Sequence, residues 1–240
     1  MIVSLSSVAS IFLLIAAVAR AFVSSGSLQR YTALASRPDT SPVARVQHGR
    51  VTIPKRTSLE MCAADDKKKV LFVCLGNICR SPSAEAVFKQ VTAEAGASEK
   101  FEIDSCGTGG GSPNWYLEGG SSYHEGNPPD ERMAMAAANR GVMLSGASRP
   151  MKAKDLEKFD LIVGMDADNA RAISTAAKHW DKSDLAEKKM RNMTAYCRAD
   201  TSMKKVPDPY YGGPQGFETV LNILDDACKG LLAACLDGTA

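Results

Sequence analysis

The chain has 240 residues and a formal net charge of +2, and its composition is that of a folded protein. Apolar residues make up 45% and charged residues 23%, which excludes a wholly disordered chain. Aromatic residues make up only 6%, too few for a surface that stacks nucleic-acid bases. The charge is divided unevenly, because residues 1–60 hold 7 basic and 2 acidic residues whereas residues 61–240 hold 22 and 25. The two parts therefore need separate interpretations.

The first segment has the features of a signal peptide. Residues 1–19 carry no charge, and residues 8–19 form a compact apolar run that ends in the small-x-small pattern Ala19-Arg20-Ala21. We therefore predict a signal peptide over residues 1–21. No basic residue precedes the apolar run, and the whole of residues 1–19 would be needed to span a membrane. A retained signal that tethers the protein to a membrane is the alternative.

Residues 22–66 have the composition of a transit peptide followed by a charged linker. They are rich in Ser, Thr, Ala and Arg, and they contain almost no acid before the run of charges at residues 65–69. A signal peptide followed by Phe22 and such a stretch resembles the bipartite presequences of algae with complex plastids. This predicts a plastid (chloroplast) protein with no membrane attachment after processing. The alternative is a disordered tail on a protein of the secretory pathway.

Residues 67–240 have the alternating pattern of one α/β domain. The continuous apolar run at 70–74 is typical of a buried parallel strand. Further strands are expected at 101–106, 160–165 and, shortest of all, 193–197. Because helical segments separate these strands, we predict a parallel sheet with helices on both faces.

The helix boundaries are predicted from capping residues. Ser81 is expected as the N-cap of a helix with Pro82 at its first position. Asp130 should cap a helix that runs to Arg140, and Asp166 should cap one that runs towards residue 178. The last helix carries a long apolar face from Phe217 to Cys235.

Chemistry is concentrated in the segment CLGNICRS at residues 74–81, between the first strand and this helix. Such a turn directs successive N–H groups into one concavity, and the helix dipole adds positive potential. Cys74 at its rim should exist largely as a thiolate, and Arg80 offers a planar fork for two phosphate oxygens. Gly76 and Asn77 tolerate the positive φ that such a turn requires. The alternative is a buried structural cysteine with a surface arginine.

A second segment, VPDPYYG at residues 206–212, supplies the complementary groups. A phenoxide or alkoxide leaves phosphorus poorly unless it is protonated, and Asp208 on a Pro-stiffened loop could donate that proton. Tyr210 and Tyr211 could form the wall of a slot for an aromatic group. Taken alone, this segment would be an ordinary turn with two half-buried tyrosines.

Together these motifs resemble the low-molecular-weight protein tyrosine phosphatase family. The resemblance runs from residue 70 to 235 through VLFVCLGNICRSPSAEAVF, DSCGT, GNPPD, FDLIVGMD and DPYYGGPQGFETV, in that order. It implies a three-layer α/β sandwich with a four-stranded parallel sheet in the flavodoxin-like order 2-1-3-4. It also implies hydrolysis of protein tyrosine phosphate or small aryl phosphates through a phosphocysteine, without metal or cofactor.

The resemblance assigns a role to each matching residue. It implies that Cys74 is the nucleophile, Arg80 the phosphate clamp and Asp208 the general acid. Ser81 would hydrogen-bond the sulfur, and Asn77 with Ser105 would brace the loop. The phosphate-binding amides would come from Leu75, Gly76, Asn77, Ile78 and Cys79. Cys79 would also form a protective disulfide with Cys74, with thioredoxin or glutathione as the reductant that reactivates the enzyme.

Three departures from the family pattern are informative. Gly146 stands where animal members often carry a bracing His, so the bracing should differ or be looser. The stretch 109–123 is long and resembles the version from photosynthetic eukaryotes; it is either a substrate wall or a Gly-rich surface loop. Tyr123 fits best as the aromatic of that wall, with Trp115 and Tyr116 as competitors. Ile78 replaces the Thr of related protein-arginine phosphatases, which favours an aryl phosphate.

Other function classes fit less well. The CxxC and CxxH pairings of zinc sites are absent, and His124 and His179 are expected at the surface. The negative charge of residues 61–240 argues against nucleic acid as a partner, and a monomer is expected. Thioredoxin-coupled arsenate reduction would need two further cysteines, and only Cys106 is near. A phosphoprotein-binding or redox-sensing module without turnover leaves Asp208 unexplained.

Overall fold

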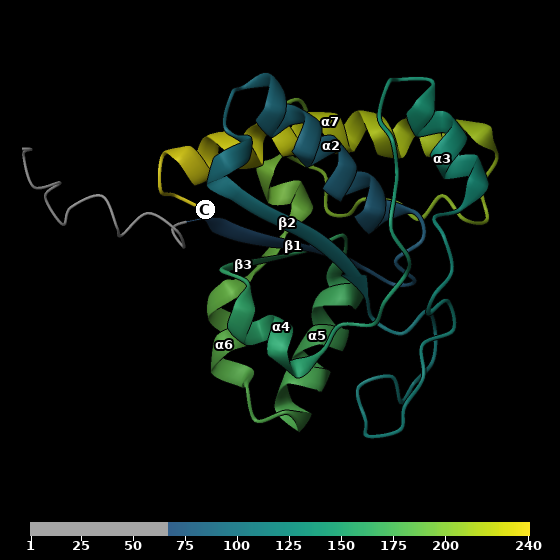
Figure 1. The fold of residues 1–240 in the computed structure, drawn as a ribbon, viewed down its shortest axis with the longest axis vertical. Coiled ribbons are helices and arrows are strands. Elements are labelled where there is room, and N and C mark those ends of the chain that lie inside the picture. The colour runs from purple at the N-terminus through teal and green to yellow at the C-terminus, as the bar shows by residue number, and fades with distance from the viewer. Residues whose placement is uncertain (1–66) are drawn as a thin grey trace, which may run out of the picture. The chain divides into compact units, whose positions relative to one another are not determined.

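Four strands form an all-parallel sheet in the computed structural model, which describes residues 67–240 (Figure 1). Strand β1 (Lys68–Cys74) lies in the interior of the sheet and pairs with β2 (Phe101–Gly107) and β3 (Leu161–Gly164). Strand β4 (Met190–Asn192) pairs with β3 at the edge. The order β2-β1-β3-β4 confirms the predicted sheet. The predicted signal peptide and the transit-like segment lie outside the described residues.

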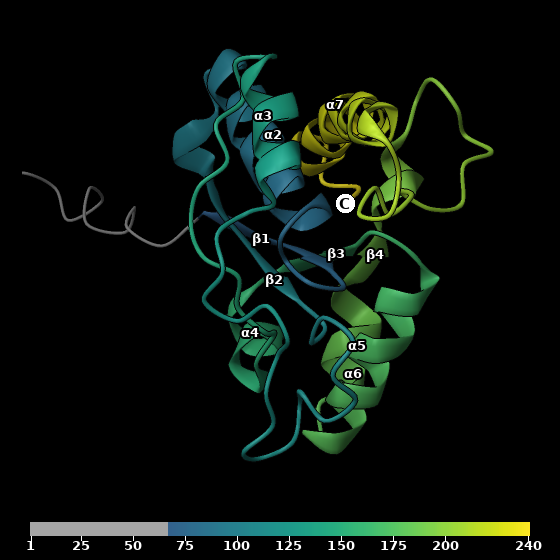
Figure 2. The same ribbon diagram turned by 90° about the vertical axis from the view of Figure 1, so that its right-hand side faces the viewer.

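Helices cover both faces of the sheet, which confirms the three-layer architecture (Figure 2). On one face lie α2 (Arg80–Glu94), α3 (Glu131–Ala138) and α7 (Pro214–Leu236). On the other lie α4 (Ala153–Lys158), α5 (Ala167–His179) and α6 (Ser183–Lys189). Two short 3-10 helices, η2 (Ser98–Lys100) and η3 (Met193–Tyr196), complete the described elements.

The central strand explains why both faces are covered. Val70 and Phe72 of β1 point into the core beneath α2 and α7, while Leu71 and Val73 point into the core over α5. All four side chains are completely buried. A strand segment that buries both faces must be continuously apolar, as β1 is from Val70 to Cys74. It therefore needs a layer of helices on each face of the sheet.

The fourth strand differs from the prediction. It spans Met190–Asn192 rather than 193–197, and the predicted segment is the 3-10 helix η3. The Asn192 side chain accepts a hydrogen bond from the backbone N of Thr194 at 3.2 Å, which ends the strand with a local turn. The buried Met193 therefore reaches the core from a helical turn, and a short apolar run could not distinguish the two.

The start of α2 also differs from the prediction. The helix begins at Arg80, with Cys79 at the N-cap position, so Ser81 is the second helical residue and not the cap. The predicted caps at Asp130 and Asp166 are confirmed, because each carboxylate accepts backbone N–H groups from the first turn of α3 or α5. Among the helices that the structure describes, none combines the length and apolar character needed to cross a bilayer.

Candidate active site

The loop between β1 and α2 surrounds the sulfur of Cys74. Cys74 is the last residue of β1 and is only 2% exposed. Its Sγ lies 3.2 Å from the backbone N of Asn77 and 3.1 Å from Oγ of Ser81, and both groups can donate to it. The serine hydroxyl also lies 3.1 Å from the carbonyl of Cys106, so its single proton can serve either acceptor. The loop thus directs two donors at one sulfur.

Asn77 holds this loop in shape. Its φ of 56° is in the left-handed region, which Asn tolerates better than most residues. Its Nδ2 donates to Oγ of Ser81 at 3.0 Å and to Oγ of Ser105 at 2.9 Å. Its Oδ1 accepts from the backbone N of Arg149 at 2.9 Å. One buried side chain therefore connects the loop, helix α2, strand β2 and the segment before α4.

The segment around Gly146 braces the loop without a histidine. Ser148 donates its hydroxyl to the carbonyl of Gly76 at 2.8 Å, next to the contact from Arg149. On the other side, the hydroxyl of Ser105 donates to Glu85 at 2.6 Å. The backbone N of Arg149 and the hydroxyl of Ser148 thus brace the β1–α2 loop, although Gly146 stands where animal members often carry a histidine.

Arg80 is the centre of a buried charge cluster. Its side chain is 4% exposed and donates to Asp166 at 2.5 Å, to Asp208 at 2.8 Å and to the carbonyl of Val206 at 3.3 Å. Burial by itself disfavours the guanidinium charge, but the neighbouring Cys74, Asp208 and Asp166 outweigh it and raise the pKa of Arg80. The guanidinium therefore stays charged, facing the sulfur.

Asp166 is a site residue that the sequence identified only as a helix cap. It does cap α5, accepting from the backbone N of Asn169 at 2.7 Å, and its other oxygen holds Arg80. Its position two residues after the end of β3 could have identified it as a site residue. The carboxyl ends of parallel strands β1 and β3 meet at the same edge of the sheet, so Asp166 and the Cys74 loop had to be neighbours.

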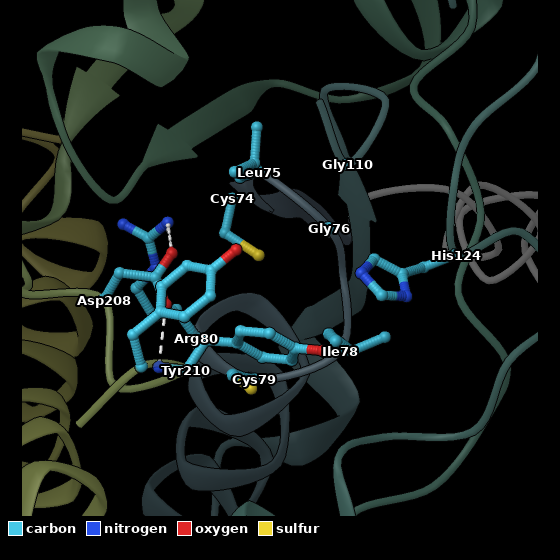
Figure 3. Close-up of a pocket in the computed structure, with 11 residues that line it drawn as sticks. Cys74, Leu75, Gly76, Ile78, Cys79, Arg80, Gly110, His124, Asp208 and Tyr210 are labelled. Carbon is cyan, nitrogen blue, oxygen red and sulfur yellow. Dashed lines mark hydrogen bonds and ion pairs between the residues drawn. The ribbon is translucent and has the colours of Figure 1, made fainter. Parts of the chain in front are cut away.

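These groups line an open pocket of about 450 Å³, which we call the Cys74 pocket (Figure 3). Its lining joins the β1–α2 loop to the segment 208–211 and to two residues of the long loop after β2. The lining residues are Cys74, Leu75, Gly76, Ile78, Cys79, Arg80, Gly110, His124, Asp208, Tyr210 and Tyr211. Asp208 also accepts from the backbone N of Tyr210 at 3.1 Å, which ties its carboxylate to its own loop. The phenol of Tyr211 is almost free, at 94% exposure of the residue.

The long loop presents His124, not Tyr123, to the pocket. Tyr123 is 75% exposed and lies outside the lining set, with its ring 4.8 Å from that of His124. The imidazole lies against Gly76 and Gly110, where a Cβ would approach its Cδ2 to 2.9 and 3.2 Å. Figure 3 shows His124 across the pocket from Asp208 and Tyr210. The expectation of a surface histidine and a pocket tyrosine is therefore reversed.

The competing aromatic residues of the long loop serve as an anchor. Trp115 is 7% exposed and packs edge-to-face with Trp180 at the end of α5, with ring centroids 5.8 Å apart. The indole N–H of Trp180 donates to the carbonyl of Tyr116 at 2.9 Å. Neither Trp115 nor Tyr116 belongs to the pocket lining. One part of the long loop thus packs against the end of α5, and only Gly110 and His124 of this loop line the Cys74 pocket.

Cys79 lines the same pocket and is held as a thiol. Burial, followed by the charges of Asp130 and Cys74, raises its pKa far above the ordinary thiol value. The structure contains six free cysteines within the residues it describes, and Cys106 is completely buried. Across residues 67–240, no three His, Cys, Asp or Glu side chains gather in a way that could hold a metal ion.

The pocket has the parts needed to bind and attack a tetrahedral oxyanion. Backbone amides at a helix N-terminus and a fixed guanidinium bind negative oxygens, and a sulfur nucleophile lies beneath them. A carboxyl group at the mouth can transfer a proton.

Comparisons with known proteins agree with this geometry. Residues 69–238 match the family model described as low molecular weight phosphotyrosine protein phosphatase. A similar curated protein is a putative low molecular weight protein-tyrosine-phosphatase of Synechocystis, 40% identical over 166 residues that cover 69% of this chain and 95% of the relative. Relatives also come from Bacillus subtilis, a yeast and animals.

Solved structures share the fold. A protein tyrosine phosphatase from Entamoeba histolytica, with Hepes in its active site, is 38% identical with a TM-score of 0.62, covering 72% of this chain and all of that one. YfkJ from Bacillus subtilis is 35% identical with a TM-score of 0.60, covering 72% of this chain and 98% of that one.

Proposed function

Because this chain belongs to the low molecular weight phosphotyrosine protein phosphatase family, we propose that it hydrolyses tyrosine phosphate on proteins, and small aryl phosphates, through a phosphocysteine on Cys74. Its relatives are named protein-tyrosine-phosphatases, which makes the chain a phosphatase. The observation that supports the proposed mechanism most is that Asp208, 128 residues after Arg80 in the sequence, lies in one pocket with Cys74 and Arg80.

In the first step, the phosphoryl group enters the β1–α2 loop and is held by backbone amides and Arg80. The Cys74 thiolate attacks phosphorus, the S–P bond forms and the bond to the phenol oxygen breaks. Asp208 donates its proton to that oxygen, so that a neutral phenol leaves. In the unliganded pocket Arg80 donates a hydrogen bond to Asp208 at 2.8 Å, so phosphate competes with that side chain for the guanidinium.

In the second step, a water molecule attacks phosphorus and the S–P bond breaks. Asp208, now ionised, accepts the proton of that water. The thiolate leaves more readily because Ser81, at 3.1 Å, and the backbone N of Asn77, at 3.2 Å, can hydrogen-bond to it. No step requires a metal or an organic cofactor.

Aryl phosphates are favoured over phosphoarginine as substrates. The pocket lining includes the aromatic side chains of Tyr210 and Tyr211 and the aliphatic Ile78. Arsenate reduction is disfavoured, because the nearest further cysteine, Cys106, is completely buried in the core. The test is an assay of the full-length chain with a metal chelator against phosphotyrosine, phosphoarginine and arsenate. Hydrolysis of phosphotyrosine alone supports the proposal, and turnover of arsenate with thioredoxin but not of phosphotyrosine contradicts it.

We also propose that Cys79 protects the nucleophile from oxidation. Peroxide would convert the Cys74 thiolate to a sulfenic acid, and the Cys79 thiol would attack that sulfur, forming the disulfide and releasing water. Both side chains line the Cys74 pocket, which supports the pairing. Thioredoxin or glutathione would supply the thiols that reduce the disulfide.

The place of the protein in the cell is a further proposal. We propose that residues 1–66 direct the chain to a plastid and are removed, leaving a monomer similar to the version from photosynthetic eukaryotes. The support is the charge and composition of those residues. A fluorescent protein fused after residue 66 should accumulate in plastids of a host with complex plastids, and secretion of the fusion would contradict the proposal.

A further inference from the structure

A second depression adjoins the loop that carries Asp208. It is an open groove of about 870 Å³, which we call the α3–α7 groove, lined by residues of helix α3 and of the start of α7. Gly212 and Pro214 line it, and they follow directly on Tyr210 and Tyr211, which line the Cys74 pocket. One loop therefore forms a wall of both depressions.

The two depressions are also joined through Arg132. Its guanidinium carbon lies 5.3 Å from the centre of the Tyr210 ring and 5.1 Å from the centre of the Phe217 ring. Tyr210 belongs to the pocket, whereas Arg132 and Phe217 belong to the groove. The Arg132 side chain therefore contacts one ring of the pocket and one ring of the groove, and the two depressions are adjacent.

The groove suits an uncharged side chain. Its two charged groups already have partners, because Arg132 pairs with Asp130 at 2.8 Å and Glu218 accepts from Nε of Arg140 at 3.0 Å. Among the remaining lining residues is Met135, which is 62% exposed and unusually accessible for its type. An apolar group placed here would cover this side chain and leave both ion pairs intact.

We propose that the α3–α7 groove binds an apolar side chain of the phosphoprotein substrate, close in sequence to the phosphotyrosine. The Arg132 guanidinium lies 5.3 Å from the Tyr210 ring and 5.1 Å from the Phe217 ring, so the two ring centres are at most about 10 Å apart. An extended chain advances ~3.3 Å per residue, so the side chain lies within roughly three residues of the phosphotyrosine. The proposal rests on the proposed function and narrows the substrate class from any phosphotyrosine protein to those with an apolar neighbour at this distance.

The test compares matched phosphopeptides on the full-length chain. Two peptides carry Leu three residues before or three residues after phosphotyrosine, and a third carries Ser at both positions. One Leu peptide should be hydrolysed with a kcat/KM about threefold to tenfold above that of the Ser peptide, the range expected when one apolar side chain is partly buried. Equal values for all three peptides would overturn the proposal. Hydrolysis of p-nitrophenyl phosphate, which cannot reach the groove, tests the proposed function separately.

Variants at Met135 assign the preference to the groove. Met135→Glu and Met135→Lys should both remove the Leu preference and leave kcat/KM for p-nitrophenyl phosphate unchanged. Because the two changes have opposite charge, an effect of general electrostatics would shift them in opposite directions. The matched control is Met143→Glu, an exposed methionine outside the groove lining, which should keep the preference. A Leu preference that survives both Met135 variants would contradict the proposal.

A binding measurement makes the test independent of turnover. In the Cys74→Ser protein, the preferred Leu peptide should bind more tightly than the Ser peptide, by the same factor, in fluorescence anisotropy. Light scattering at rising protein concentration examines the other possible occupant, a second copy of the chain. A dimer that Met135→Glu dissociates would assign the groove to self-association and overturn the proposal.

Discussion

Asp208 is the residue whose chemistry depends most on the leaving group. It stands 2.8 Å from Arg80 at the pocket mouth, with its carboxylate also tied to the backbone of Tyr210. If it protonates the leaving oxygen, Asp208→Ala should slow turnover of phenyl phosphate by roughly 10²–10⁴-fold. The loss should be much smaller for p-nitrophenyl phosphate, since nitrophenoxide leaves without help. Steady-state kinetics with both esters check this, and an equal loss for the two would argue against proton donation.

Cys79 makes a prediction about oxidation. Because burial and nearby negative charges raise its pKa, Cys79 is a thiol that reacts only after Cys74 has been oxidised. Peroxide should therefore inactivate the enzyme reversibly, with a Cys74–Cys79 disulfide visible by mass spectrometry.

The matched variant is Cys79→Ser, which should lose activity to peroxide irreversibly as Cys74 passes to sulfinic acid. Cys197→Ser, a change at another buried cysteine outside the pocket lining, should keep reversibility. Full recovery of Cys79→Ser after treatment with a thiol would refute a protective role for Cys79.

At the residue scale, residues with distinctive chemistry could be predicted from the sequence. Residues whose place in the pocket depends on the room left by their neighbours could not. Cys74, Arg80 and Asp208 were identifiable because few other roles explain them, and they do line one pocket. The choice between Tyr123 and His124 was not readable, because a Gly-rich loop has no periodicity that orients adjacent side chains. It depends on Gly76 and Gly110, which leave room for an imidazole.

The shape of the β1–α2 loop depends on the hydrogen bonds of the Asn77 side chain and on the positive φ of that residue. Asn77→Gly keeps the freedom to adopt a φ of 56° but removes the hydrogen bonds to Ser81, Ser105 and Arg149. Asn77→Ala removes the same bonds and adds about 1 kcal/mol of backbone strain. Both variants should have a lower kcat/KM, and Ala should be the less stable of the two in urea denaturation. Wild-type activity in either variant would show that the loop keeps its shape without these bonds.

Helix α3 provides a test of pH dependence. Asp130 caps it and also donates its backbone N to the carbonyl of Ile78 in the β1–α2 loop at 2.8 Å. The Arg132 side chain donates hydrogen bonds to Asp130 and lowers its pKa. The positive charge of Arg132 and the backbone N–H donors of Arg132 and Met133 lower it further. A group with a lowered pKa stabilises the folded state above its unfolded pKa and loses that contribution as the pH falls through its folded pKa.

Asp130→Ala should therefore cost about 1 kcal/mol of unfolding free energy at pH 7, the usual value for a lost cap. The difference from wild type should shrink below about pH 4, because the wild-type carboxyl is protonated first in the unfolded chain and, at lower pH, in the folded one. Asp130→Asn keeps a capping oxygen and cannot titrate, so it should lie between the two at pH 7. Denaturation curves from pH 3 to pH 7 check this, and a gap that widens in acid would contradict the assigned charge state.

At the scale of elements, patterns with a clear period were predictable and short runs were not. The interior strand and the caps of α3 and α5 follow from local sequence, whereas β4 is only three residues long. Its place in the chain is decided by the Asn192 turn and by how η3 packs against α7, which are tertiary effects.

The whole molecule explains how residues so far apart form one site. Parallel strands end at one edge of the sheet, so the loop after β1 and Asp166 after β3 meet there without any special contact. The loop with Asp208 reaches the same edge through a hydrogen bond from the backbone N of Val206 to the carbonyl of Met165, at 2.9 Å. The parallel sheet could be inferred from the strand–helix alternation and its strand order from the family resemblance, but this last contact could not.

The most direct test of the account is to identify the phosphorylated residue during turnover. The full-length chain, mixed with p-nitrophenyl phosphate in the presence of a metal chelator, is denatured within the first turnovers and analysed by mass spectrometry. We expect a phosphoryl group on the peptide that contains Cys74, and neither a phosphoryl group nor hydrolysis in Cys74→Ser. A phosphoryl group on another residue, or full activity in Cys74→Ser, would contradict it.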